Sequence, residues 1–495
     1  MLAASDGLGR QISKCYFPSR KLSHKAYGES TLYANIQNEY NTSIGTGDKK
    51  LDEIFKAYDI RGKVGDQLNA EVVEKIGQAY ADWLPQDGKV AVGYDMRPDS
   101  QEFAEALIKG ITAQGYEVWD IGPVTTDMVY FAVGNYSMAG GAMVTASHNP
   151  GEYNGIKLVR EKARGIGLGS GLEKIRDAVI SETASFELKT GTVKQKDVMD
   201  AWIDHVLAFI NPSQLSPYKI AIDTGNGMAG KIIPLIAARL PFEITPLFFE
   251  LDGSFPNHPA NPLEPANLED LIKVVKEKKL DLGIAFDADG DRMAMVDGNG
   301  EIVSGTLLSC MLAEYFLQEE PGAVMLYNAT MGRAFKETVL ANEGKPVRTR
   351  NGHSYIKQAM LENEAYFGAE HSMHFFFKEN WNADSGLIAA IVLLAALSET
   401  GWTLAQYASK FKRYVQIPET NFEVDDKQAI IDKISAEFGD GKQDLLDGLT
   451  VNFENSWFNV RPSNTEPLLR LNAEALTQEE LDALVRRVKQ AAGLE

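Results

Sequence analysis

The chain has 495 residues, 44% of them hydrophobic and 24% charged, which is ordinary for a globular protein and long enough for three or four domains. Acidic residues outnumber basic ones by 69 to 49, and the net charge of -20 argues against binding to nucleic acid or to anionic membranes. Only Cys15 and Cys310 are present, which excludes a disulfide framework and favours a reducing compartment.

The first 50 residues or so differ in composition from the rest of the chain. Five basic residues face Asp6 alone as an acid in the first 28 positions, serine and threonine are frequent, and no apolar core of a secretory signal is visible. We interpret residues 1–50 as an extension, either a disordered tail or the product of a misplaced start codon. A targeting segment for an organelle is the alternative, and otherwise we expect the protein in the cytoplasm.

From Leu51 onward one unit recurs, in which a short apolar run is followed by an abrupt Gly/Asp/Asn loop and a helical pattern. The runs predicted to form strands are KVAVGYD (89–95), KIAIDTGNG (219–227), LDLGIAFDADG (280–290) and AVMLYNATMG (323–332). A typical helix has Leu268 and Val275 on one face after a capping Asn267. Strands alternating with helices predict α/β domains with mixed, mainly parallel sheets, whose ligands bind beyond the carboxyl ends of the strands.

Polar stretches near residues 190, 300 and 415 are candidate boundaries between domains. They divide the chain into domain 1 (51–195), domain 2 (196–300), domain 3 (301–412) and domain 4 (413–495). The last segment ends on a helix that starts at Thr477, with Glu480 as a capping-box residue, and it predicts a smaller α+β domain. The longest apolar run, Leu387 to Leu397, has 11 residues and is too short for a bilayer core that needs roughly 20, so we expect a buried helix and no membrane span.

Three aspartates alternate in the motif DADGDR, which follows the apolar run LGIAF. Asp287, Asp289 and Asp291 would repel one another strongly unless a hard divalent cation lay between them. An EF-hand does not fit, because its sixth position would be Arg292 and its twelfth Gly298. A solvated acidic turn is the alternative. Arg292 would hold an anionic group that shares the metal.

Ser147 lies in the motif TASHNP, beside His148. Adjacent serine and histidine cannot form a catalytic triad by that adjacency, and a serine before Asn-Pro is often only a turn or cap residue. Lys157, ten positions on, and the aspartates favour a functional role. Beside Mg²⁺ a serine is better placed to exchange a phosphoryl group than an acyl group, and its phosphoryl oxygen would be a fourth metal ligand.

Two further loops carry groups that suit a sugar phosphate. In RPSNTEP, a tight turn presents donors that suit a non-reacting phosphate, from Arg461, Ser463, Asn464 and Thr465. In GAEHSMH, Glu370 and Ser372 would point to the same side of an extended segment and clamp two sugar hydroxyls, while His374 would titrate near neutral pH. A plain surface turn is the alternative for the first loop. Arg61 in YDIRG and Arg97 in GYDMRP are weak signals taken singly.

With TASHNP, DADGDR, GAEHSMH and RPSNTEP in that order, the sequence resembles the α-D-phosphohexomutase superfamily, in its phosphomannomutase/phosphoglucomutase branch, over residues 51–495. The resemblance implies three similar α/β/α domains and a smaller α+β domain around a central cleft. It also implies a serine that carries the phosphoryl group, at Ser147, a Mg²⁺ site at the three aspartates and the serine, and sugar and phosphate sites at the two loops.

The resemblance further implies transfer of a phosphoryl group between hexose 6-phosphate and hexose 1-phosphate, through a hexose 1,6-bisphosphate, with mannose or glucose as the sugar. For proton transfer or its support it points to four residues that the sequence does not rank, Lys157, Arg61, His353 in NGHSYIK, and His374. Small hexose phosphates are the expected partners of a monomer or homo-oligomer.

Two departures and three alternatives accompany this resemblance. Met373 stands where a small residue is usual and would narrow the sugar site, while Asn464 argues against an amino sugar. The alternatives are a phosphoglucosamine mutase, a metal-dependent phosphatase of the haloacid-dehalogenase type with Asp287 as nucleophile, and a non-catalytic sugar-phosphate binder.

Overall fold

A computed structural model describes residues 49–84, 88–181, 189–424, 426–462 and 468–493. The chain divides into two units, residues 1–46 and 47–495, and every described residue belongs to the second. The interpretation of the N-terminal extension therefore lies outside the described residues, apart from its last two positions, and so does Cys15.

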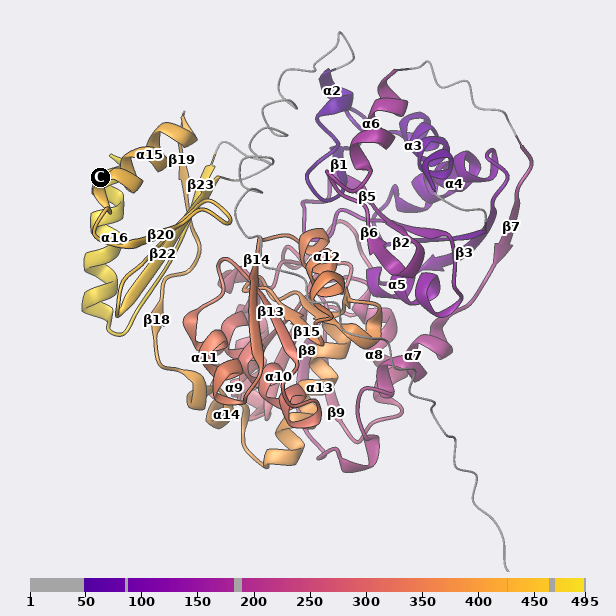
Figure 1. Cartoon of the computed structure of the whole chain (residues 1–495). Coiled ribbons are helices and arrows are strands. Elements are labelled where there is room, and N and C mark those ends of the chain that lie inside the picture. The colour runs from indigo at the N-terminus through magenta and orange to yellow at the C-terminus, as the bar shows by residue number, and fades with distance from the viewer. Residues whose placement is uncertain (1–48, 85–87, 182–188, 425, 463–467, 494–495) are drawn as a thin grey trace, which may run out of the picture. The chain divides into compact units, whose positions relative to one another are not determined.

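The first domain is built on a mixed sheet with the strand order β1-β5-β4-β2-β3-β7, in which β6 pairs with β5. The strands are β1 (Ile60–Lys63), β2 (Lys89–Tyr94), β3 (Glu117–Pro123), β4 (Gly140–Val144), β5 (Tyr153–Arg160), β6 (Arg164–Gly165) and β7 (Thr192–Gln195). The helices are α2 (Lys49–Asp52), α3 (Ala70–Trp83), α4 (Ser100–Thr112), α5 (Thr126–Asn135) and α6 (Leu172–Ile180). Helices α3, α4 and α6 share one hydrophobic core, whereas α5 belongs to another (Figure 1).

The second domain repeats this plan with the strand order β12-β11-β10-β8-β9. The strands are β8 (Lys219–Asp223), β9 (Glu243–Leu247), β10 (Leu282–Phe286), β11 (Met293–Asp297) and β12 (Ile302–Val303). The helices are α7 (Met199–Leu207), α8 (Ala229–Ala237) and α9 (Glu269–Lys278). Strands β8, β9 and β10 are parallel, while β11 and β12 are antiparallel to their neighbours.

The third domain repeats it again with the order β14-β13-β15-β16-β17. The strands are β13 (Val324–Asn328), β14 (Lys345–Thr349), β15 (Phe367–Ala369), β16 (Phe375–Phe377) and β17 (Ala383–Asp384). The helices are α10 (Gly305–Glu319), α11 (Arg333–Ala341), α12 (His353–Asn363), α13 (Gly386–Thr400) and α14 (Leu404–Phe411). The fold class expected from the sequence, three similar α/β domains with mixed sheets, is confirmed.

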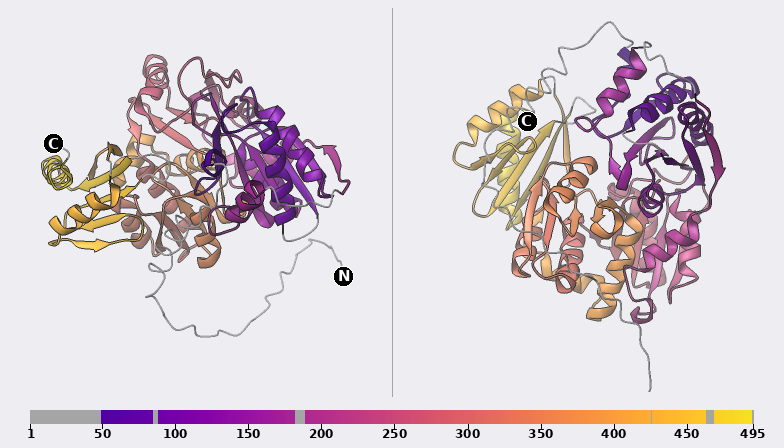
Figure 2. Two further views of the ribbon diagram at one scale, coloured as in Figure 1. Left: turned by 90° about the horizontal axis from the view of Figure 1, so that it is seen from above. Right: turned by 45° about the vertical axis from the view of Figure 1, so that its right-hand side comes forward.

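The last domain has an antiparallel sheet, as expected for a smaller α+β module. The strand order is β18-β23-β22-β21-β20, with β19 paired to β23. The elements are β18 (Val415–Gln416), β19 (Thr420–Glu423), α15 (Lys427–Glu437), β20 (Lys442–Asp444), β21 (Leu449–Asn452), β22 (Ser456–Pro462), β23 (Leu468–Ala475) and α16 (Gln478–Ala492). Helices α15 and α16 pack together on one face of this sheet (Figure 2).

Three local predictions meet different outcomes. The run from Leu387 to Leu397 is a buried part of α13, as expected. The Thr477 side chain caps α16, also as expected. Asn267, however, does not cap α9, because a short 3₁₀ turn intervenes and its amide bonds Asn261 instead. Among the described residues, no single helix is long and apolar enough to cross a membrane, and α13 with α14 passes that test only across a 93° bend.

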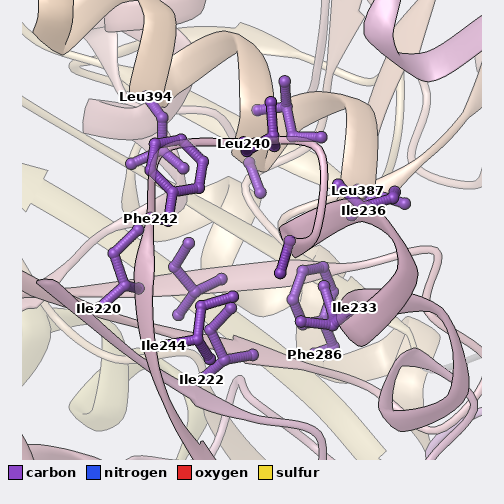
Figure 3. A pocket seen from close by; sticks show the side chains of 14 residues that line it. Ile220, Ile222, Ile233, Ile236, Leu240, Phe242, Ile244, Phe286, Leu387 and Leu394 are labelled. Atoms are coloured by element: carbon purple, nitrogen blue, oxygen red, sulfur yellow. The ribbon is translucent and has the colours of Figure 1, made fainter. Parts of the chain in front are cut away.

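A cavity of about 30 Å³ lies between the second sheet, α8 and α13 (Figure 3). Its lining is entirely apolar and includes Ile222, Phe286 and Leu394. The lining offers no polar group that could bind a water molecule or a sugar phosphate. This cavity is therefore a gap in packing and not a site for a sugar phosphate.

Candidate active site

Three of the loops singled out from the sequence occupy the same position in the three repeated sheets. Each follows a parallel strand that ends in small or apolar residues and leads into an antiparallel neighbour: β4 into β5, β10 into β11, and β15 into β16. The parallel strand delivers the loop to the carboxyl edge of its sheet, and the antiparallel partner fixes where the chain returns. Ser147, the three aspartates and Glu370 lie in these loops.

Ser147 is almost fully buried and faces the aspartates of the second domain. Its hydroxyl donates a hydrogen bond of 3.0 Å to Asp287 Oδ2, and its amide donates to Thr145 Oγ1 at 2.9 Å. Its φ of 50° lies in the left-handed region, which is uncommon for serine and is typical of strained functional positions. The turn predicted from Asn-Pro exists, and it presents the serine to the acidic loop.

The three aspartates form a buried cluster that fits a metal ion. Asp287, Asp289 and Asp291 each offer a carboxylate oxygen within 4.8 Å of the others, and none is more than 1% exposed. Among the described residues, Asp289 Oδ1 and Asp291 Oδ1 have no hydrogen-bond partner. Unpaired buried carboxylate oxygens are costly, and a hard divalent cation with oxygen ligands would satisfy them. Burial, followed by the other two aspartates, raises the pKa of Asp287 well above its usual range.

Lys157 on β5 reaches the same cluster from the first domain. Its ammonium group donates to Asp289 Oδ2 at 2.6 Å and to Asp291 Oδ2 at 2.5 Å. Burial opposes the charge, but the two carboxylates outweigh burial and hold the pKa of Lys157 well above its usual value. Lys157 is therefore a fixed positive charge in this arrangement, suited to stabilising phosphoryl oxygens.

Arg61 on β1 lies against the serine loop. Its guanidinium contacts Asp59 at 2.9 Å, and Nη1 donates to the side chain of Asn149 at 2.5 Å and to the carbonyl of Ala146 at 3.3 Å. Burial opposes its charge, and Asp59 outweighs burial, so the pKa is raised. Arg61 thus adds a second permanent positive charge beside Ser147.

Arg292, which follows the three aspartates in sequence, contacts both His148 and Asp287. Its Nη2 lies 2.8 Å from His148 Nδ1, and its Nε lies 3.6 Å from Asp287 Oδ2. Because arginine only donates, His148 Nδ1 is an acceptor here. Burial, followed by Arg292, lowers the pKa of His148 well below its usual value. His148 Nδ1 also lies 3.3 Å from Ser147 Oγ, but it already accepts from Arg292, and burial together with Arg292 keeps the ring neutral.

The loop GAEHSMH, which the sequence predicts to bind the sugar and which we call the sugar loop, is not the extended segment that was predicted. The pairing of Ala369 with Phe375 makes residues 370–374 a turn, so strand alternation does not place Glu370 and Ser372 on one side. Glu370 is 4% exposed, and Oε1 accepts from the amide of Gly352 at 2.9 Å. Met373 is 6% exposed and packs next to Gly305, and its effect on the sugar site stays a prediction.

His374 is oriented by Asp384, a residue that the sequence analysis missed. His374 Nδ1 lies 2.8 Å from Asp384 Oδ2 and 3.8 Å from Asp291 Oδ1, and Asp384 also pairs with Lys357 at 2.8 Å. Burial opposes the charge of Asp384, but Lys357 and His374 outweigh burial and lower its pKa well below the usual range. The only sequence signal was an acid at the start of an apolar helix, which is too common to single out.

His353, the first residue of α12, lies near the Tyr58 ring, with centroids 5.8 Å apart. Among the described residues neither ring nitrogen has a hydrogen-bond partner. Burial, followed by Lys357, lowers its pKa to about 3, so the ring is neutral. His353 is adjacent to Gly352, whose amide binds Glu370, and the sugar loop and the start of α12 are therefore linked.

Arg461 on β22 forms an ion pair with Glu419, from Nη2 to Oε2, of 2.9 Å. The same carboxylate accepts from Arg470 at 3.1 Å and from Asn472 at 3.1 Å. The other predicted phosphate-binding residues, Ser463, Asn464 and Thr465, lie outside the described residues. In the described part, no direct contact joins Arg461 to Ser147 or the aspartates.

Comparison with known proteins covers nearly the whole chain. Four family models match in order: phosphoglucomutase/phosphomannomutase alpha/beta/alpha domain I at residues 52–185, domain II at 200–300, domain III at 304–414, and the C-terminal domain at 419–491.

Individual relatives agree with these models. A Xanthomonas campestris protein named phosphohexose mutase is 42% identical over 85% of this chain and 94% of its own length. A phosphomannomutase/phosphoglucomutase of Pseudomonas aeruginosa is 37% identical over 87% and 93%. The crystal structure of a phosphoglucomutase/phosphomannomutase family protein from Burkholderia thailandensis is 33% identical, covers 89% of this chain and 98% of its own, and has a TM-score of 0.82.

Proposed function

The chain belongs to the phosphoglucomutase/phosphomannomutase family of the α-D-phosphohexomutase superfamily and is a hexose-phosphate mutase, and from this premise we propose that it works through phosphoserine 147 and a hexose 1,6-bisphosphate. The substrates we propose are the 1- and 6-phosphates of glucose, mannose or both. One observation carries the proposal: the hydroxyl of Ser147 donates at 3.0 Å to Asp287 Oδ2, a carboxylate of the buried three-aspartate cluster.

The phosphoryl group on Ser147 passes to the free hydroxyl of a bound hexose monophosphate. A new P–O bond forms to the sugar oxygen and the bond to Ser147 Oγ breaks. The proton of the sugar hydroxyl goes to a base, and Ser147 Oγ takes up a proton to become a free hydroxyl. The bisphosphate then turns end over end, and its other phosphoryl group returns to Ser147 by the reverse step. Lys157, Arg61 and Arg292 place positive charge around the serine and stabilise the phosphoryl oxygens throughout.

Asp287, Asp289 and Asp291 would hold a Mg²⁺ ion, with a phosphoserine oxygen completing its ligands. The ion would supply positive charge that stabilises the transferring phosphoryl oxygens. Unpaired oxygens on Asp289 and Asp291 support this assignment.

For the base we propose His374. Lys157 and Arg61 are held charged by carboxylates and cannot accept a proton. His374 is oriented by Asp384 through Nδ1, which leaves Nε2 to meet a sugar hydroxyl. His353 is neutral and lies beside Tyr58, and we place it among the residues that line the sugar site.

We assign binding of the sugar to the third domain and binding of the non-reacting phosphate to the fourth. Glu370 and Ser372 would read hydroxyls that look alike in both orientations of the intermediate, and Arg461 with residues 463–465 would grip the phosphate that does not react. Closure over the intermediate would exclude water, which otherwise competes for the phosphoryl group. Because the chain belongs to an enzymatic mutase family, neither a phosphatase that uses Asp287 as nucleophile nor a non-catalytic binder is retained.

The test is intact-mass measurement of the purified chain before and after incubation with glucose 1,6-bisphosphate. We expect one phosphate on the wild type and none on Ser147→Ala, whose mutase activity should fall at least 10³-fold because the phosphoryl carrier is gone. Ser170→Ala, in a loop of the same domain, is the matched control. Phosphate-free wild type that still turns over glucose 1-phosphate would contradict the phosphoserine route. Turnover of glucosamine 1-phosphate, with none of glucose or mannose 1-phosphate, would show an amino-sugar mutase instead.

A further inference from the structure

We propose that Arg97 is a positioning residue for the nucleophile. It holds the loop of Ser147 in the conformation that directs the serine hydroxyl at Asp287. This inference rests on the proposed role of Ser147. Arg97 does not contact Ser147 Oγ, and it would act through the backbone alone.

All four terminal N–H donors of the Arg97 guanidinium bind backbone carbonyls of one short segment. Nη2 donates to the carbonyls of Ser147 at 2.7 Å and Asn149 at 2.6 Å. Nη1 donates to the carbonyls of Pro150 and Tyr153, both at 2.8 Å. Every one of these acceptors lies between the nucleophile and the start of β5, so one side chain organises the whole turn.

The guanidinium is itself held by an ion pair and by an aromatic ring. Asp95 Oδ2 lies 3.3 Å from Arg97 Nε, and Asp95 is bound in turn by the hydroxyl of Ser100 at 2.5 Å. The ring of Phe255, from the second domain, covers the guanidinium with its centroid 5.2 Å away. The Arg97 side chain is 1% exposed. A side chain fixed this well by charge, packing and burial can impose a backbone geometry on its partners.

The segment needs such support because its conformation is unfavourable alone. Ser147 has φ of 50°, and a residue other than glycine persists there only when its surroundings enforce it. Buried carbonyls without donors are equally unfavourable. Arg97 answers both needs, because it binds the buried carbonyl of the left-handed Ser147 and the carbonyl of Asn149 in the turn that follows.

A lysine cannot replace this arrangement. Its ammonium group has three donors on one atom, whereas the arginine fork spreads its donors across a plane that matches four separate carbonyls. Arg97→Lys keeps the charge beside Asp95 but removes the fork. The substitution therefore separates a positioning role from a purely electrostatic one.

The experiment compares wild type, Arg97→Lys and the control Arg487→Lys, a partly exposed arginine of α16 that also donates to a backbone carbonyl. For Arg97→Lys we expect kcat with glucose 1-phosphate to fall on the order of 10²-fold while KM stays within threefold, because the reacting atom is misplaced and the sugar site is intact. Hydrogen–deuterium exchange on the full chain should quicken at residues 147–153 and stay unchanged in the third domain. Arg487→Lys should match wild type in all three measurements.

A wild-type kcat in Arg97→Lys overturns the proposal. So does a fall in kcat that comes with unchanged exchange at 147–153, or one that only tracks the loss of folded protein. If Arg97→Lys does not fold, Asp95→Asn carries the same test, because Asp95 orients the guanidinium, and the same split between kcat and KM is expected. Failure of the wild type to take up phosphate on Ser147 would instead overturn the proposed function.

Discussion

Ser147 and Asp287 are 140 positions apart in sequence, and the hydroxyl of the first donates a hydrogen bond of 3.0 Å to the carboxylate of the second. The two residues occupy the same place in successive copies of one structural unit, the loop that follows a parallel strand and enters an antiparallel one. Repetition of the unit thus supplies the proposed nucleophile from one domain and the proposed metal ligands from the next.

Asp289 should be required for metal affinity. Asp289→Asn removes one negative oxygen from the cluster and disturbs the contact with Lys157, so the Mg²⁺ concentration for half-maximal activity should rise at least tenfold. The measurement is a Mg²⁺ titration of initial rates after removal of metal with EDTA. Asp252→Asn, in an exposed turn of the same domain, should titrate like wild type. Equal curves for both variants would mean that the cluster does not hold the activating ion.

Asp384 should support His374 through orientation. Asp384→Asn leaves a neutral partner at Nδ1 and removes the charge that pairs with Lys357, so we expect kcat to fall about 10²-fold with KM within a few-fold of wild type. Steady-state rates with glucose 1-phosphate give the comparison. The control is Asp297→Asn, a buried aspartate that caps a turn at the end of β11. A rise in KM at constant kcat would assign Asp384 to sugar binding.

Glu419 should lower the affinity of the fourth domain for the substrate phosphate. Its carboxylate pairs with both Arg461 and Arg470, and these arginines outweigh the effect of burial, so the pKa of Glu419 is lowered and the group is charged. Glu419→Gln removes this competing anion, and KM for glucose 1-phosphate should fall about twofold to fivefold at low ionic strength.

Glu437→Gln, which breaks an ion pair with Arg487 in the same domain, is the control and should leave KM unchanged. A higher KM in Glu419→Gln would show that the carboxylate serves to orient the arginines.

Asp127 should make stability depend on pH. Burial raises its pKa to about 7, partly offset by hydroxyl donors from Ser385 and Thr125. The folded state therefore retains a proton that the unfolded state loses near pH 4, and stability contributed at this site falls as pH rises from about 4 to about 7. Asp127→Asn has no carboxyl group at this site, so it does not lose stability there as the pH rises.

Relative to wild type, the free energy of unfolding of Asp127→Asn should therefore rise by roughly 2–3 kcal/mol between pH 5 and pH 7. Thermal unfolding of both proteins at the two pH values measures the difference. Asp177→Asn, an exposed position on α6, should show none. A constant gap between Asp127→Asn and wild type would mean that Asp127 has an ordinary pKa.

Much of the fold could be predicted from the sequence alone. Runs such as KVAVGY and KIAID form strands, as predicted, because a short apolar run bounded by Gly, Asp or Asn is typical of a buried strand. The failures were local. Asn267 does not cap α9, because a 3₁₀ turn precedes that helix. The sugar loop is the turn of a hairpin, because strand pairing decides where a short segment bends and pairing is not a local property.

The site divides along the same line. Residue type and spacing within one loop were sufficient to single out the three aspartates, whereas Ser147 was distinguished from a turn serine only by Lys157 and the aspartates elsewhere in the sequence. Only the tertiary structure brought Lys157 to Asp289, Asp384 to His374, and Arg97 to the carbonyls behind the serine. The two members of each pair lie on separate strands and loops, and their pairing depends on distance, burial and charge once the domains have folded.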